Sequence, residues 1–84
     1  MMDKKAVARS LEQIASFMEL KGENPFRVRA ITTAARVVNG LAGDLATALD
    51  DGTLAEAKGI GPATLQIVQE LVGTGRSSLL EEMR

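Results

Sequence analysis

The chain of 84 residues contains no cysteine, histidine, tryptophan or tyrosine, and only two phenylalanines. The absence of cysteine excludes disulfides, thiol catalysis and thiolate metal sites, and the absence of histidine excludes a Ser-His triad and histidine-ligated metals. No apolar run approaches the roughly 20 residues that a membrane-spanning helix needs, and the N-terminus is amphipathic and charged, unlike a signal peptide. We therefore expect a cytoplasmic protein that has no membrane partner.

The formal net charge is only −1, which argues against a strong and indiscriminate nucleic-acid binder. The charge is distributed unevenly, because residues 1–40 carry seven Lys or Arg against four Asp or Glu, whereas residues 41–84 carry three against seven. The basic excess lies mainly at Arg27, Arg29 and Arg36. On charge alone, these arginines are equally consistent with a solvated helix face and with a nucleic-acid contact.

Apolar residues at helical spacing predict helices along the whole chain and no strand. The first helix carries apolar residues along one side and ends at Lys21-Gly22. The second begins with Asn24 as N-cap and Pro25 in the first turn. Asn39-Gly40 closes the second helix. The expected buried positions are Val7, Leu11, Ile14 and Met18 in the first helix, and Phe26, Ala30, Ala34, Val37 and Leu41 in the second.

Four further helices are expected in the second half of the chain. Two short ones cover residues 44–49 and 53–57, the latter capped by Thr53, and a last one starts at the capping-box pattern from Ser78 to Glu81. Between them, a helix that ends at Gly73 and Gly75 carries Leu65, Val68, Leu71 and Val72. The expected fold is an all-α, compact bundle of about five or six short helices in a single domain over residues 1–84. The short stretch after the last capping box suggests the fragment of a longer protein.

The stretch Gly59-Ile60-Gly61-Pro62 lies where two helical patterns meet. Both glycines permit a sharp reversal, including positive φ, and Ile60 between them is expected to fill the gap between the helices. The following helix would present unpaired N–H groups at Gly61, Ala63 and Thr64, which together with the helix dipole favour an anion. Glycines without a Cβ let a phosphate approach closely. A lone G-x-G is more simply a turn between helices.

The apolar flanks favour a functional turn, because Leu54 and Ala57 precede it and Leu65 and Val68 follow it, as in a helix-hairpin-helix motif. The segments "GENPFRVRAITTAARVV", "GIGPATLQIVQELVGTGR" and "LLEEMR" occur in this order. Over residues 5–84 the chain resembles the N-terminal helix-hairpin-helix domain of family X DNA polymerases, especially the bacterial type. The resemblance implies a role in base excision DNA repair, with the nucleoid as location in a bacterium.

By this resemblance, the domain binds gapped or nicked DNA at its 5′-phosphate side through backbone contacts, and the remaining polymerase domains are its other partners. No cofactor is required, but a monovalent cation (K⁺ or Na⁺) is expected on the backbone carbonyls of Ala55, Ala57 and Ile60. The implied DNA-binding residues are Lys58, Gly59, Gly61, Ala63, Thr64, Arg27, Arg29 and Arg76.

The sequence departs from the family at three positions. Ile67 stands where members with 5′-deoxyribose-phosphate lyase activity have the Schiff-base lysine, Ala63 replaces a phosphate-binding lysine, and Ile31 replaces an aromatic residue. We therefore expect no enzyme in this chain alone, whereas the parent protein would be a DNA-directed DNA polymerase. Two alternatives remain open: a residual lyase that uses Lys58, and a decayed domain that acts as a protein-interaction module.

Overall fold

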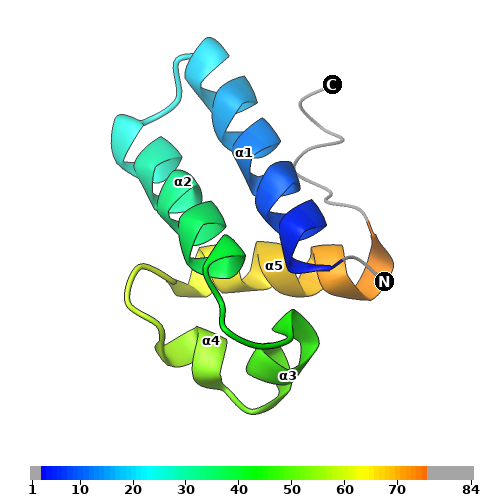
Figure 1. Cartoon of the computed structure of the whole chain (residues 1–84). Coiled ribbons are helices and arrows are strands. Elements are labelled where there is room, and N and C mark those ends of the chain that lie inside the picture. Colours follow the sequence, from blue (N-terminus) through cyan, green and yellow to red (C-terminus); the bar gives the residue numbers. More distant parts are fainter. Residues whose placement is uncertain (1–2, 76–84) are drawn as a thin grey trace.

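The computed structural model describes residues 3–75, which form five helices and no strand (Figure 1). None of these helices is both long and apolar enough to span a membrane. The prediction of an all-α bundle is confirmed, but the helix expected from Ser78 and the predicted site residue Arg76 lie outside the described residues. The helices are α1 (Lys4–Leu20), α2 (Pro25–Asn39), α3 (Leu45–Asp50), α4 (Thr53–Glu56) and α5 (Pro62–Thr74).

Helices α1 and α2 form an antiparallel pair joined by a short turn in which Gly22 has a φ of 75°. Side-chain caps fix where each helix begins, because they satisfy amides that the first turn leaves without a partner. The Asp3 carboxylate accepts a hydrogen bond from the Ala6 amide at 2.8 Å. The predicted N-cap Asn24 accepts one from the Phe26 amide at 2.9 Å. The predicted end of α1 at Lys21-Gly22 and the predicted start and end of α2 are confirmed, whereas the start of α1 at the Asp3 cap was not predicted.

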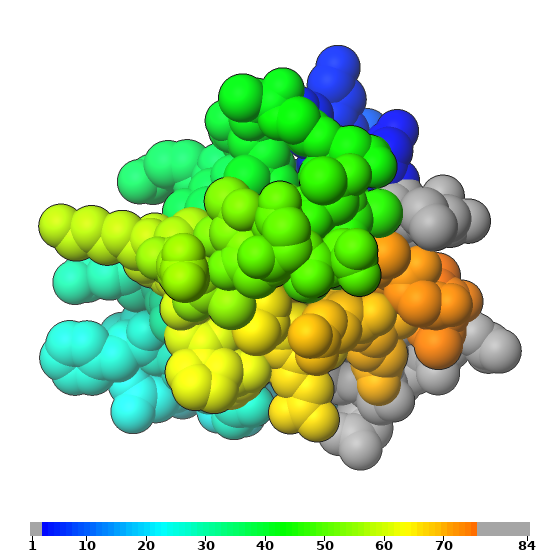
Figure 2. All heavy atoms as spheres, turned by 90° about the horizontal axis from the view of Figure 1, so that it is seen from below, coloured from blue at the N-terminus to red at the C-terminus, as the bar shows by residue number. Residues whose placement is uncertain are grey.

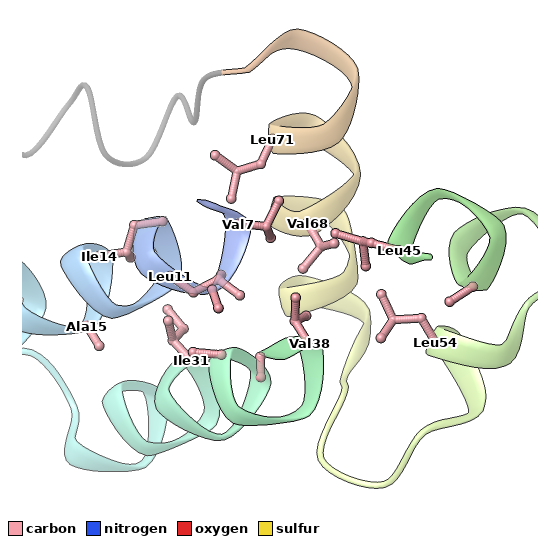
Figure 3. Packing of buried hydrophobic residues seen from close by; sticks show 14 of the residues in the cluster. Val7, Leu11, Ile14, Ala15, Ile31, Val38, Leu45, Leu54, Val68 and Leu71 are labelled. Atoms are coloured by element: carbon pink, nitrogen blue, oxygen red, sulfur yellow. The ribbon is translucent and has the colours of Figure 1, made fainter. Parts of the chain in front are cut away.

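The hydrophobic core lies where α5 crosses the ends of the other helices (Figure 3). In both views α5 lies between the α1–α2 pair and the α3–α4 pair. Each large side chain buried there stabilises the fold by about 1.5–3 kcal/mol relative to an exposed one. The predicted stripe of α1 is confirmed, since all four of its residues are fully buried. The core residues include Val7, Leu11, Ile14, Met18, Ile31, Val38, Leu45, Leu54, Val68 and Leu71.

The predicted buried face of α2 is partly wrong. Phe26 is 76% exposed and Ala30 is also exposed, whereas Ile31 is 1% exposed and belongs to the core. The face that contacts α1 and α5 is rotated from the predicted one and consists of Ile31, Ala34, Ala35 and Val38. The sequence offers two overlapping apolar stripes on this helix, and only the position of α1 decides which one is buried.

Two predicted helix ends in the second half also need correction. Thr53 is the first residue of α4 and not its cap, because the Asp51 carboxylate accepts the Thr53 amide at 2.9 Å and Gly52 turns the chain with a φ of 81°. Gly73 lies inside α5, which ends at Thr74, followed by Gly75 with a φ of 76°. A single glycine in a helix costs only about 1 kcal/mol, so Gly73 does not stop α5.

Gly59 joins the α4–α5 turn to α2. Its φ is 96°, a conformation that side chains rarely adopt, and a Cβ added to it would lie 2.7 Å from Cγ2 of Thr33 and 3.6 Å from Cγ2 of Val37. The backbone of the turn therefore packs directly on the side of α2, which places the turn beside the C-terminal half of that helix (Figure 1).

Substitution Gly59→Ala should destabilise the domain by about 1–3 kcal/mol, because the new methyl group enters a strained conformation and meets Thr33. For a domain of this size each kcal/mol lowers the melting temperature by roughly 4–8 °C. Thermal and urea unfolding followed by circular dichroism measure the change. Gly43→Ala is the matched control and should change the melting temperature little, because Gly43 is exposed in the α2–α3 loop, does not have a positive φ, and an added Cβ meets nothing within 4 Å. Equal stability of both variants would contradict the packing of Gly59 on α2.

Hydrogen bonds from the Thr53 side chain and then from its backbone amide hold the pKa of Asp51 below its usual value of 3.8. A lowered pKa in the folded state means that the hydrogen-bonded Asp51 carboxylate stabilises the domain above pH 4. This stabilisation is lost as the pH falls through the folded pKa. The unsubstituted chain should therefore have a larger free energy of unfolding than Asp51→Asn at pH 7, and this difference should shrink below pH 4. Urea unfolding at several pH values measures it, and a difference that does not depend on pH would contradict the cap.

Candidate nucleic-acid interface

The hairpin turn connects the end of α4 to the start of α5 in five residues, 57–61. Its backbone is closed by a hydrogen bond from the Ile60 amide to the Ala57 carbonyl at 3.2 Å. The Ile60 side chain is half-buried and packs against the core, which confirms the prediction that it fills the space between the two helices. Gly59 and Gly61 on either side of it are exposed. The turn therefore presents its main chain to solvent while Ile60 anchors it.

Gly61, the N-cap of α5, does not use the positive φ that a glycine permits. Its φ of −99° and ψ of 172° are open to any residue. The nearest atom to an added Cβ would be Oγ1 of Thr64 at 4.0 Å, which is ordinary contact. Neither backbone conformation nor packing among the described residues thus requires glycine here. What a side chain at this position would obstruct is the approach of another molecule to the start of α5.

The Thr64 hydroxyl occupies one of the amides that we expected to be unpaired. The Gly61 amide donates to Oγ1 of Thr64 at 2.9 Å, and this hydroxyl donates to the Gly61 carbonyl at 3.0 Å. The prediction of an unpaired amide at Gly61 is therefore wrong. The amides of Ala63 and Thr64 lie in the first helical turn, where no intrahelical acceptor exists, and a glycine N-cap supplies no side-chain acceptor. Ala63 is exposed whereas Thr64 is only 5% exposed, so the Ala63 amide is the more accessible candidate for an anion.

Exposed basic side chains lie on α2 and on the hairpin itself, and the exposed Glu56 precedes the hairpin directly. Lys58 is exposed within the turn, and Arg27, Arg29 and Arg36 are exposed on α2. In the space-filling view, side chains around the start of α2 (cyan) project from the same edge of the molecule as the hairpin (yellow-green) (Figure 2). Arg27 lies about 120° around the helix from Thr33, the residue that contacts the hairpin. Of the three arginines, it is therefore the one farthest around α2 from the hairpin contact.

Sequence analysis missed one exposed aromatic residue. Phe26 was expected in the core, but it lies seven residues before Thr33 and thus on the same side of α2 as the hairpin contact. Leu20, at the end of α1, is 83% exposed near the same α1–α2 turn. The one sequence signal for an exposed Phe26 is its position in the first helical turn, next to Arg27.

The two isoleucines at family-specific positions have packing roles. Ile67, at the position of the lyase lysine, is half-buried and packs against the core, and Ile31, at the aromatic position, is buried. Ala63, at the position of a phosphate-binding lysine, is exposed on the first turn of α5. The hairpin of this chain therefore offers main-chain amides and Lys58 where related proteins add lysine side chains.

The expected cation site remains a prediction. The Ala57 carbonyl already accepts the Ile60 amide, but a carbonyl oxygen has a second lone pair and stays able to bind a cation. Residues 3–75 contain no cluster of three or more acidic side chains that would hold a metal ion. A cation at the hairpin would thus rest on carbonyl oxygens, those of Ala55, Ala57 and Ile60.

The comparisons with known proteins agree with this geometry. Residues 2–77 match the family model described as a helix-hairpin-helix domain. The chain is also 40% identical, over 89 aligned positions, to the DNA polymerase/3'-5' exonuclease PolX of Bacillus subtilis (strain 168). The match covers 99% of this chain but only 14% of the relative's length. The predicted resemblance to the helix-hairpin-helix domain of a family X polymerase is confirmed, and the chain belongs to the helix-hairpin-helix domain family.

Proposed function

We propose that this chain binds the DNA backbone without sequence preference, at the 5′-phosphate side of a gap, as the helix-hairpin-helix domain of a family X DNA polymerase in DNA repair. Its similarity to a bacterial enzyme named as a DNA polymerase supports the DNA partner. The structural observation that carries the proposal is Gly61, an exposed glycine that neither backbone strain nor packing within residues 3–75 explains.

A phosphate at the start of α5 would meet three favourable features. The amides of Ala63, which is exposed, and of Thr64, which is buried, lie in the first turn without an intrahelical acceptor, and the helix dipole adds about 0.3–1 kcal/mol for a negative charge there. Gly61 has no Cβ, so a phosphate oxygen reaches these amides without a steric obstacle. Lys58 lies three residues earlier in the same exposed turn and adds a positive charge. A single phosphate held this way gives weak binding, so neighbouring basic side chains must contribute.

The same chemistry carries no sequence information. Main-chain amides and arginines that contact phosphates fix where a protein sits on DNA, whereas sequence is read at base edges. The hairpin is a tight turn anchored by Ile60, and it presents no extended helix or strand that would enter a groove. We therefore assign this domain the recognition of a DNA end or gap, and we assign it no catalytic step, because Ile67 offers no amine where the lyase lysine would stand.

The chain should bind DNA with a one-nucleotide gap and a 5′-phosphate more tightly than the same DNA with a 5′-hydroxyl, and more tightly than intact duplex. With few phosphate contacts, the slope of log K against log salt concentration should be roughly −2 to −4, at about 0.9 per phosphate. Fluorescence anisotropy over a salt series measures both quantities. Identical affinities for all three DNAs at low salt would exclude the gap-binding role, and no binding to any of them would favour a protein-interaction module.

Substitution Gly61→Val should weaken binding to the gapped DNA about tenfold or more while leaving the fold intact. The branched side chain fits the extended backbone at residue 61, but it covers the path to the Ala63 and Thr64 amides. Gly43→Val is the matched control, because Gly43 is exposed in the α2–α3 loop and has nothing within 4 Å of an added Cβ. Anisotropy titrations at equal folded fraction measure the effect. Unchanged affinity in Gly61→Val would show that the phosphate does not contact the start of α5.

A further inference from the structure

We propose that the exposed face of α2 that carries Arg29 and Arg36 is a second phosphate-binding surface, continuous with the hairpin. This inference rests on the proposed function, because it names where the DNA strand runs once a phosphate lies at the start of α5. The partner is the phosphate backbone of that same strand. The surface adds affinity and direction, and it reads no bases.

The hairpin contact fixes which face of α2 is involved. Gly59 packs against Thr33 and Val37, so the hairpin covers that side of the helix. Arg29 lies four residues before Thr33 and Arg36 three residues after it, spacings that place side chains on the same side of a helix. The two arginines therefore border the hairpin, one turn below and one turn above its contact. They are exposed on the side of α2 opposite to the core residues Ile31 and Val38.

The spacing of the two arginines fits a DNA backbone. Seven residues of helix correspond to about 10.5 Å along its axis at 1.5 Å per residue. Neighbouring phosphates of one strand in duplex DNA lie farther apart than the axial rise of about 3.4 Å per nucleotide, because the strand winds around the axis, so two guanidinium groups at this spacing can contact separate phosphates. A strand that places one phosphate at the hairpin can thus run along α2 and meet both side chains.

The local charge also favours an anionic partner on this surface. Residues 25–39 contain three arginines and no acidic residue. No described carboxylate forms a salt bridge with Arg29 or Arg36. Glu19 and Glu23 border a shallow hollow that Arg29 also lines, and their charges weaken the attraction at that end. Arg36 does not line this hollow, so it should contribute more than Arg29.

A double variant, Arg29→Ala with Arg36→Ala, tests the surface in the full chain. Two lost phosphate contacts should reduce the magnitude of the salt slope for gapped DNA by about 1.8, at about 0.9 each, and weaken binding at low salt. The control is Lys5→Ala with Arg9→Ala, which removes two exposed cations from α1 and leaves the net charge equal to that of the test variant. Melting temperatures confirm that both variants fold.

The result that supports the inference is a smaller slope in the α2 variant and a parent-like slope in the α1 control. Equal slopes in the two double variants would overturn the inference and leave the hairpin site standing. If the unsubstituted chain does not bind gapped DNA, both the proposed function and the α2 surface are overturned. As a second arm, methylphosphonate substitution within about three nucleotides of the 5′-phosphate should weaken binding by the parent chain but not by the α2 variant.

Discussion

The contact between the backbone at Gly59 and the side chain of Thr33 links the parts of this molecule that matter for its function. A turn that connects two helices could point in many directions, but here the missing Cβ lets the main chain lie against α2. Ile60 then anchors the turn in the core, and α5 begins at a fixed position relative to the arginines of α2. Because all three pieces share one packed contact, the amides of α5 and the cations of α2 keep fixed positions relative to one another, which the proposed phosphate-binding surface requires.

The two glycines of the hairpin are not equivalent, although the motif treats them as a pair. Gly59 is required by the fold, since its φ of 96° and its contact with Thr33 leave no room for a side chain. Gly61 has an ordinary extended backbone, and the hydroxyl of Thr64 holds its amide and its carbonyl. Because these two hydrogen bonds occupy the Gly61 amide, an anion at this turn would have to bind the amides of Ala63 and Thr64. Structure therefore explains the first glycine by strain and packing, whereas the second has only the preference of helix N-caps for glycine over larger apolar residues as its reason within the described residues.

Sequence reasoning predicted the parts of this fold that depend on local chemistry. The caps Asn24 and Gly75, the stripe of α1 and the anchoring of Ile60 follow from helix periodicity and from backbone preferences of single residues. It failed for Phe26, because the burial of one of two apolar stripes on α2 depends on where α1 lies. It also failed for the Gly61 amide, since the rotamer of Thr64 cannot be read from the motif. Nothing in the sequence shows that Arg29 and Arg36 border the hairpin, which depends on the contact at Thr33.

The weak backbone binding proposed above would suit a domain tethered within a longer protein, such as the relative that this chain matches over 14% of its length. When such a domain is tethered to another DNA-binding unit, its local concentration near the DNA reaches the millimolar range, and modest affinity becomes sufficient. The uneven charge then matters more than the net charge of −1. In the proposed role, the acidic residues of α3 and α4, including the exposed Glu56 next to the hairpin, would disfavour DNA, whereas the arginines of α2 would favour it. The charge distribution would then orient the domain on the DNA, and tethering would provide most of the occupancy.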